Sequence, residues 1–235
     1  MMMKTKDKIL VIGDIHGRDI WKKIVEKEAE TVDKIVFIGD YFDTPMVSPE
    51  KILENFKDIL EYKRQYSDKV VLLIGNHDWH YMSGVDSKCS GYERNAVEFG
   101  KNLDEAFERD EIQMSYKNGD VLFTHAGASN SWLDRANIDL KDVDNSINSL
   151  SKSDKEKFSF WKFDSTGYGE HPCQSPIWIR PNSLARELSD KWVQVVGHTQ
   201  MDSIRNFEDR FILVDTLSKK EYLKLVEGEF IINKL

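Results

Sequence analysis

The sequence has little that could cross-link the chain or anchor it in a membrane. Its two cysteines, Cys89 and Cys173, are too few for a disulfide framework and are not spaced like zinc ligands. The apolar run near the start ends at Gly13 and Asp14, which is too early for a signal-peptide core, and no run elsewhere approaches a membrane span. We therefore expect free thiols, a cytoplasmic location and no association with membranes.

Positive charge is also scarce. The chain has 33 Lys and Arg against 41 Asp and Glu, a formal net charge of −8. Extended binding to nucleic acid needs a positive surface that displaces counterions, so we do not expect it. An anionic substrate stays compatible with this charge, because bound cations can reverse the local field.

The first third of the chain alternates strand and helix patterns. Apolar, β-branched runs predict buried strands, and helical patterns separate them; Pro49 stands at the first position of the second helix. The strands are predicted over 8–13, 33–39 and 69–75, and the helices over 19–30 and 48–66. This order implies a parallel sheet covered by helices.

The rest of the chain is less regular. Asn118-Gly119 predicts a hairpin, and a non-periodic aromatic stretch predicts an ordered loop over a site, while further strands follow. These patterns give a helix over 91–110, polar helical composition over 129–157, the loop over 158–181, and strands over 191–197, 210–215 and 221–233. No linker divides the chain. We therefore expect one domain over 1–235, with a helical and loop insertion around 129–181 near the site.

Five apolar runs end in the same way, at Asp, Asn or His. They are VIGDIHG, VFIGDYFD, LLIGNHD, LFTHAG and VVGHTQ. One such ending could be turn chemistry, but these endings hold four of the 6 histidines, and ligands bind where strand carboxyl ends meet their loops in open α/β sheets. We therefore expect convergence of Asp14, His16, Asp40, Asn76, His77, His125 and His198.

These donors limit the chemistry. Carboxylate and amide oxygens with imidazole nitrogens, and no thiolate, suit Mn²⁺, Fe²⁺ or Zn²⁺. There are too many donors for one ion, and two ions about 3.5–4 Å apart can clamp a phosphoryl group and hold a bridging hydroxide. No Ser, Cys or Lys stands in a nucleophile motif, so water is the expected nucleophile.

The motifs GDIHG, GDYFD, GNHD, THAG and GHT, in this order, resemble the signature of the calcineurin-like metallophosphoesterases. The resemblance covers residues 8 to about 217 and implies an α/β, four-layer fold, a β-sandwich of mixed sheets flanked by helices, around a two-metal centre. It implies that Asp14 and His16 hold the first metal, that Asp40 bridges both, and that Asn76, His125 and His198 hold the second.

The same resemblance implies a catalytic pair. His77 matches the family's proton donor to the leaving group, and Asp43 matches its carboxylate partner. A metal-ligand role for His77 is the alternative. Asp215 is interpreted as support for the site from the end of a strand, and His80 as a rim or packing residue.

Within the family, the sequence resembles the phosphoprotein phosphatase and bacterial diadenosine tetraphosphatase branch. Gln200 stands where many phosphodiesterases have a second metal-binding His, and Arg180 in PIWIRP matches a phosphate-binding arginine. Arg180 could instead be a surface residue stacked on Trp178. The sequence departs from the branch at Thr44, where a second arginine is usual; Arg18 and Arg94 are candidates to replace it.

The sequence thus predicts a metal-dependent phosphoesterase that hydrolyses phosphate monoesters by attack of a hydroxide held between two metals, with Mn²⁺ the expected ion and Fe or Zn as alternatives. Its substrate would be a phosphoprotein, a small phosphoester or a nucleotide. Cleavage of a dinucleoside polyphosphate is an alternative reaction, and a non-catalytic module that binds a phosphorylated ligand is an alternative of another class.

Overall fold

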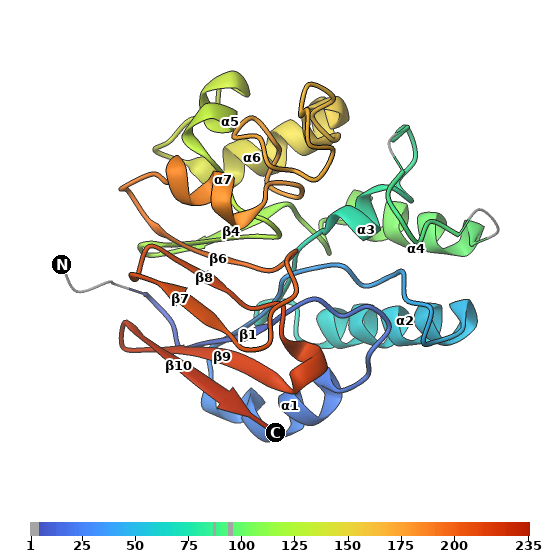
Figure 1. Cartoon of the computed structure of the whole chain (residues 1–235). Coiled ribbons are helices and arrows are strands. Elements are labelled where there is room, and N and C mark those ends of the chain that lie inside the picture. Colours follow the sequence, from blue (N-terminus) through green and yellow to red (C-terminus); the bar gives the residue numbers. More distant parts are fainter. Residues whose placement is uncertain (1–4, 87, 94–95) are drawn as a thin grey trace.

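The structure is a computed structural model that describes residues 5–86, 88–93 and 96–235. Its centre is a pair of mixed β-sheets, each with five strands, packed face to face (Figure 1). The first sheet has the order β10-β9-β1-β2-β3. Its strands are β1 (Ile9–Ile12), β2 (Lys34–Phe37), β3 (Val70–Leu72), β9 (Glu221–Val226) and β10 (Glu229–Lys234). The strands β1, β2 and β3 pair in parallel, as their alternation with helices predicts.

The second sheet has the order β4-β5-β6-β8-β7. Its strands are β4 (Ser115–Asn118), β5 (Val121–Thr124), β6 (Val193–Val196), β7 (Arg205–Phe207) and β8 (Phe211–Leu213). The predicted hairpin is confirmed, since β4 and β5 pair antiparallel with Asn118 opposite Val121. The sequence did not indicate β7, because this short edge strand is mostly exposed and has no apolar run.

The continuous apolar runs are explained by burial on both faces of each sheet. Ile9, Val11 and Val36 belong to the cluster between the two sheets, whereas Leu10 and Ile12, next to them in sequence, pack in the cluster under the helices. Side chains alternate between faces along a strand, so a strand covered on both sides has no polar positions.

Helices cover the outer face of each sheet, which gives the four layers that the resemblance implies. The helices α1 (Trp21–Glu28) and α2 (Pro49–Gln65) lie against the first sheet, and α5 (Asn130–Arg135), α6 (Val143–Ser153) and α7 (Pro181–Arg186) lie on the side of the second (Figure 1). Pro49 opens α2 as predicted. The remaining helical segments are α3 (Asn76–Trp79), α4 (Val97–Glu108), η1 (Ala29–Thr31), η2 (Lys155–Phe158) and η3 (Leu217–Lys219).

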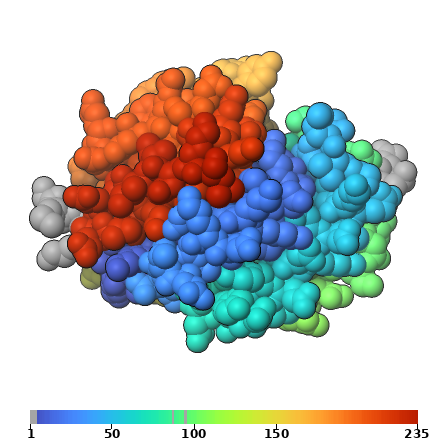
Figure 2. Space-filling model, turned by 90° about the horizontal axis from the view of Figure 1, so that it is seen from below, coloured from blue at the N-terminus to red at the C-terminus, as the bar shows by residue number. Residues whose placement is uncertain are grey.

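The two ends of the chain are joined through the first sheet. In the view from below, the C-terminal strands lie directly against N-terminal segments (Figure 2), and β9 pairs antiparallel with β1. Glu28, at the end of α1, fixes this junction: its carboxylate accepts hydrogen bonds from the Tyr222 hydroxyl at 2.7 Å and from Lys224 Nζ at 2.6 Å. No helix in the described part of the chain is long and apolar enough to cross a membrane.

Candidate metal centre

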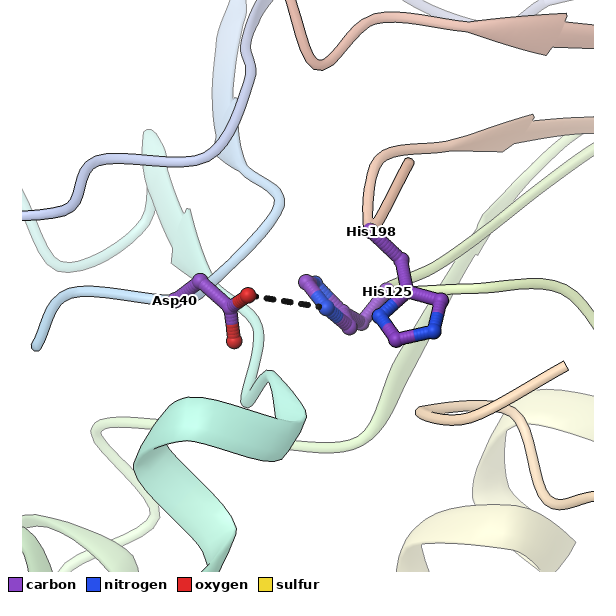
Figure 3. Close-up of side chains that lie close together, drawn as sticks. All are labelled: Asp40, His125 and His198. Atoms are coloured by element: carbon purple, nitrogen blue, oxygen red, sulfur yellow. Dashed lines mark ion pairs between the residues drawn. The ribbon is translucent and has the colours of Figure 1, made fainter. Parts of the chain in front are cut away.

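The five strand endings singled out in the sequence meet at one end of the sandwich. They follow β1, β2 and β3 in one sheet and β5 and β6 in the other. Because the strands within each set run parallel, their carboxyl ends share an edge. Figure 3 shows side chains from three of these endings, Asp40, His125 and His198, lying close together.

One group of donors surrounds Asn76, whose side chain is buried. Its Oδ1 lies 3.0 Å from Nε2 of His125 and 2.8 Å from Nδ1 of His198. Nε2 of His125 also lies 3.3 Å from Oδ2 of Asp40. The ligand atoms of Asp40, His125 and His198 all lie within 4.8 Å of one another, which is close enough to surround a single ion.

A second group consists of Asp14, His16 and Asp40, whose ligand atoms also lie within 4.8 Å of one another. Nε2 of His16 is 3.6 Å from Oδ2 of Asp40. Asp40 therefore belongs to both groups. This is the arrangement expected of a carboxylate between two neighbouring ions.

Backbone carbonyls fix which ring nitrogens point into the centre. Nδ1 of His16 donates to the carbonyl of Phe42 at 2.8 Å, and Nδ1 of His125 donates to the carbonyl of Ile38 at 3.0 Å. A carbonyl only accepts, so in both rings Nδ1 carries a proton and Nε2 is the nitrogen that faces Asp40. Such contacts orient metal-binding histidines.

The backbone is held in the left-handed region at four residues of the site. The angle φ is 42° at His16, 52° at Asp40, 59° at Asp43 and 67° at His198. Each such residue costs on the order of 1–3 kcal/mol, and such strain gathers where side chains must be aimed at a site.

Glycines give the room for this packing. A Cβ built on Gly75 would lie 2.0 Å from Oδ1 of Asp40, and one built on Gly197 would lie 2.0 Å from Oδ1 of Asp14. No side chain fits at either position, which explains the glycine that precedes the polar residue in these endings.

The electrostatics of the centre fit bound cations. Oδ1 of Asp14 is buried without a hydrogen-bond partner among the described residues. Burial and the nearby carboxylates of Asp215 and Asp40 hold the pKa of Asp14 well above its usual value. Burial also raises the pKa of Asp40, but His125 and His77 outweigh it, and the net pKa is well below the usual value. A divalent ion beside Asp14 would satisfy its unpaired oxygen and offset the carboxylate repulsion.

His77 points to a different partner from the other histidines. Its Nδ1 lies 2.9 Å from Oδ2 of Asp43, and its backbone N–H donates to Oδ1 of Asp40 at 2.9 Å. Burial lowers the pKa of His77, but Asp40 and the hydrogen bond to Asp43 outweigh it and raise the pKa to about 12. The ring is therefore held as an imidazolium beside the two groups of donors.

The model of the calcineurin-like phosphoesterase family matches residues 7–226 of the chain. The chain belongs to this family. Members of the family use divalent metal ions, and the two groups that share Asp40 are candidate ligand sets for them.

This calcineurin-like phosphoesterase is similar over a short segment to catalytic subunits of serine/threonine-protein phosphatases. A segment of 79 residues is 32% identical to the serine/threonine-protein phosphatase 4 catalytic subunit of Eremothecium gossypii, over 33% of this chain and 24% of the relative. The corresponding subunit of Saccharomyces cerevisiae is 30% identical over the same length. The matches therefore span about a quarter of these relatives.

Solved structures show the same fold. A cold-active protein-tyrosine phosphatase of a Shewanella species superposes with a TM-score of 0.64 at 19% identity, covering 97% of this chain and 78% of that one. A protein serine/threonine phosphatase from Saccharomyces cerevisiae gives a TM-score of 0.56 at 15% identity, covering 97% and 79%. At these identities, the likeness concerns the fold alone.

Several residues of this phosphoesterase centre had no role in the sequence analysis. Asp78, the last residue of GNHD, is fully buried, and its carboxylate accepts the backbone N–H groups of Asp40, Tyr41 and Gly75 at 2.7–2.8 Å. It thus ties two strand endings together. The only signal for this role was its place in the motif, because the partners of Asp78 include residues more than 30 positions away.

His80 was interpreted as a rim or packing residue. It is fully buried rather than at the rim, with Nε2 2.8 Å from Oδ2 of Asp43. Tyr81 donates its hydroxyl proton to the other oxygen of Asp43 at 2.6 Å. Asp43 therefore contacts His77, His80 and Tyr81 together, and these contacts outweigh burial to lower its pKa.

The sequence offers three arginines as candidates for phosphate binding. Arg180 donates from Nε to the Tyr168 carbonyl and from Nη1 to the His198 carbonyl, both at 2.9 Å. Burial lowers the pKa of Arg180, while Asp40 and Asp14 raise it, so the guanidinium lies within electrostatic reach of both donor groups. Arg18 follows the first strand ending, and Arg94 lies outside the described residues. Gln200 is exposed and donates to the hydroxyl of Ser218 at 3.1 Å.

Proposed function

We propose that this protein hydrolyses phosphate monoesters at a centre of two divalent ions. The observation that carries the proposal is that Asp40 belongs to both groups of metal donors, while the His77–Asp43 pair lies directly beside them. Family membership supports the same reaction class.

The donors suit two ions of borderline character. Asp14 and His16 would hold the first, Asp40 would bridge, and a set of three would hold the second: Asn76, His125 and His198. We propose Mn²⁺, with Fe or Zn suited to the same oxygen and nitrogen donors. Bound there, the two ions would supply Lewis acidity at the phosphoryl oxygens and activate a water for in-line attack.

His77 would complete the reaction as general acid. Water releases one proton to the solvent as its oxygen attacks phosphorus, and the bond from phosphorus to the leaving oxygen breaks. The leaving oxygen takes a proton from Nε2 of His77, which is then reprotonated from the solvent. Asp43 holds Nδ1 and stabilises the imidazolium before transfer. A cavity of about 760 Å³, lined by His77, Thr44 and Phe99 among others, adjoins this side and offers room for the leaving group.

Arg180 would bind the substrate phosphate. Its planar guanidinium matches phosphate geometry, and its contacts with the carbonyls of Tyr168 and His198 fix the side chain close to the centre. Thr44 lines the leaving-group cavity in place of the second arginine that is usual in this branch. We propose that Arg18 takes the role of this missing second arginine, since the other candidate, Arg94, lies outside the described residues.

We propose a phosphorylated protein as the substrate class and the cytoplasm as the location. The similarity to serine/threonine phosphatase catalytic subunits supports this substrate class. A small phosphoester or a dinucleoside polyphosphate is the competing substrate, and both would use the same centre.

The substitution His77→Asn tests the mechanism. We expect the variant to keep two equivalents of metal and to lose roughly 10²–10⁴-fold in kcat on alkyl phosphates. The loss should be smaller on p-nitrophenyl phosphate, whose leaving group needs little protonation. His171→Asn is the matched control, because His171 lies in the loop before α7 and bonds the N–H of Cys173.

Equal losses on both kinds of substrate, or loss of metal, would contradict the role of His77 as acid. A metal-loaded wild-type protein that turned over none of the substrates would point instead to a binding module. Parallel assays on a phosphopeptide, bis(p-nitrophenyl) phosphate and diadenosine tetraphosphate separate the substrate classes.

A further inference from the structure

A third group of metal donors lies beside the two that share Asp40. It consists of Asp43, His77 and Cys89, whose ligand atoms lie within 4.8 Å of one another. None of the three belongs to the first two groups, and this group alone among them contains sulfur. Cys89 has no assigned role, and its side chain is partly exposed to solvent.

The distances in this group approach those of a tetrahedral zinc site. Sγ of Cys89 lies 3.6 Å from Nδ1 of His77, and the bond lengths of zinc place such a pair about 3.5 Å apart. Nδ1 of His77 lies 2.9 Å from Oδ2 of Asp43, whereas a nitrogen and an oxygen bound to the same tetrahedral zinc ion are about 3.4 Å apart. Lengthening the distance between His77 Nδ1 and Asp43 Oδ2 by about 0.5 Å would therefore bring both pairs to zinc-site spacing.

The surroundings hold two of the three ligands in place. Tyr81 donates its hydroxyl proton to Oδ1 of Asp43 at 2.6 Å, and Nε2 of His80 lies 2.8 Å from Oδ2. His80 also anchors Cys89: its Nδ1 accepts the Cys89 backbone N–H at 3.3 Å and lies 2.8 Å from Sγ. Gly91 packs against Asp43 so closely that a Cβ on it would lie 3.0 Å from the Cβ of Asp43. Partners of this kind orient metal ligands and raise metal affinity.

We propose that Asp43, His77 and Cys89 form a third metal site, selective for a thiophilic divalent cation such as Zn²⁺ or Cd²⁺. Thiolate is a soft ligand, so this site prefers softer cations than do the oxygen and nitrogen donors around Asp40. Three protein ligands leave the fourth position of a tetrahedral ion to water, as the partial exposure of Cys89 allows.

Occupation of this site would inhibit the enzyme. The cation takes the lone pair of Nδ1 of His77 in place of a proton, so the ring cannot become the imidazolium that protonates the leaving group. It also takes Oδ2 of Asp43, the partner that holds the ring. This consequence rests on the proposed function, whereas the binding of the cation does not.

Cobalt binding tests the site without any measurement of activity. Thiolate ligation gives Co²⁺ an intense near-ultraviolet charge-transfer band, which oxygen and nitrogen ligands do not give. We expect wild-type protein to bind three equivalents of Co²⁺ and to develop this band. Cys89→Ser should bind two and lose the band, while Cys173→Ser, the matched control, should behave like the wild type.

A wild-type protein without the band, or a band that survives Cys89→Ser, would overturn the proposed site.

A second experiment tests whether occupation of this site inhibits the enzyme. Zn²⁺ is added to the Mn²⁺-loaded protein, and both the activity and the retained Mn²⁺ are measured. We expect at least a tenfold higher inhibitory Zn²⁺ concentration for Cys89→Ser than for Cys173→Ser. Equal inhibition of both variants would refute inhibition through Cys89. A protein that binds three equivalents of Co²⁺ but shows no turnover when loaded with two equivalents of Mn²⁺ alone would overturn the proposed function and leave the metal site intact.

Discussion

The substitution Gly197→Ala tests the geometry of the centre with a single added methyl group. Gly197 lies between β6 and His198, and its new Cβ would be 2.0 Å from Oδ1 of Asp14 and 3.0 Å from Cγ2 of Ile38. Non-bonded atoms of this kind are most stable about 3.5 Å apart, so the Asp14 carboxylate must move by more than about 1 Å. Gly197 itself is outside the left-handed region, so alanine adds no backbone strain there.

The displacement of the Asp14 carboxylate determines the expected loss of activity. A shift of about 1 Å in a catalytic constellation costs on the order of 10²-fold in rate, and we expect kcat on p-nitrophenyl phosphate with Mn²⁺ to fall by roughly that factor. Metal content, measured by mass spectrometry after dialysis, should fall below two equivalents. Overpacking of this kind also costs about 1–3 kcal/mol of stability, which thermal unfolding would show.

Gly84→Ala is the control for this experiment. Gly84 has a φ of +79° and nothing within 4 Å of the new Cβ, so the alanine strains the backbone without a steric clash. It should bind metal and turn over substrate as the wild type does. If Gly197→Ala kept two equivalents of metal and a rate within about threefold of the wild type, the close approach to Asp14 would not control the centre.

Three further predictions follow from other contacts. Asp40→Asn should lose metal and activity together, because Asp40 belongs to both donor groups; two equivalents of retained metal would remove the bridging role. Arg180→Ala should raise KM and weaken inhibition by inorganic phosphate with the metals still bound, and unchanged kinetics on several substrates would reduce Arg180 to a loop anchor. Glu28→Gln should cost about 1 kcal/mol in urea unfolding at pH 7, since the amide keeps one acceptor oxygen but loses the charge that strengthens the hydrogen bonds from Tyr222 and Lys224. Burial raises the pKa of Glu28, but Lys224 and Tyr222 outweigh it and hold the pKa below its usual 4.5. The unfolded chain therefore binds the proton more readily, so the stability difference should be full above pH 4.5 and shrink as the pH falls through the lowered pKa. A difference that stayed constant down to low pH would contradict this account.

The sequence by itself determined the parts of the protein that depend on neighbours along the chain. Apolar runs such as 8–13 and 69–75 gave buried strands, Pro49 gave the start of α2, and Asn118-Gly119 gave the hairpin. These features follow from local preferences and from side-chain alternation, which short windows contain. The repeated endings also indicated convergence, because parallel strands bring their carboxyl ends to one edge.

Only the tertiary structure decided which side chains meet at that edge. Asp78 ties two strand endings together, His80 is buried against Asp43, and Cys89 lies beside His77, although the loop that carries Cys89 has no periodic pattern. The short strand β7 and the contact of Glu28 with Lys224 were equally invisible, the latter joining residues 196 positions apart. Such contacts depend on how the two sheets and their loops pack. No local preference encodes them, because the energy of each contact exists only after the segments have come together.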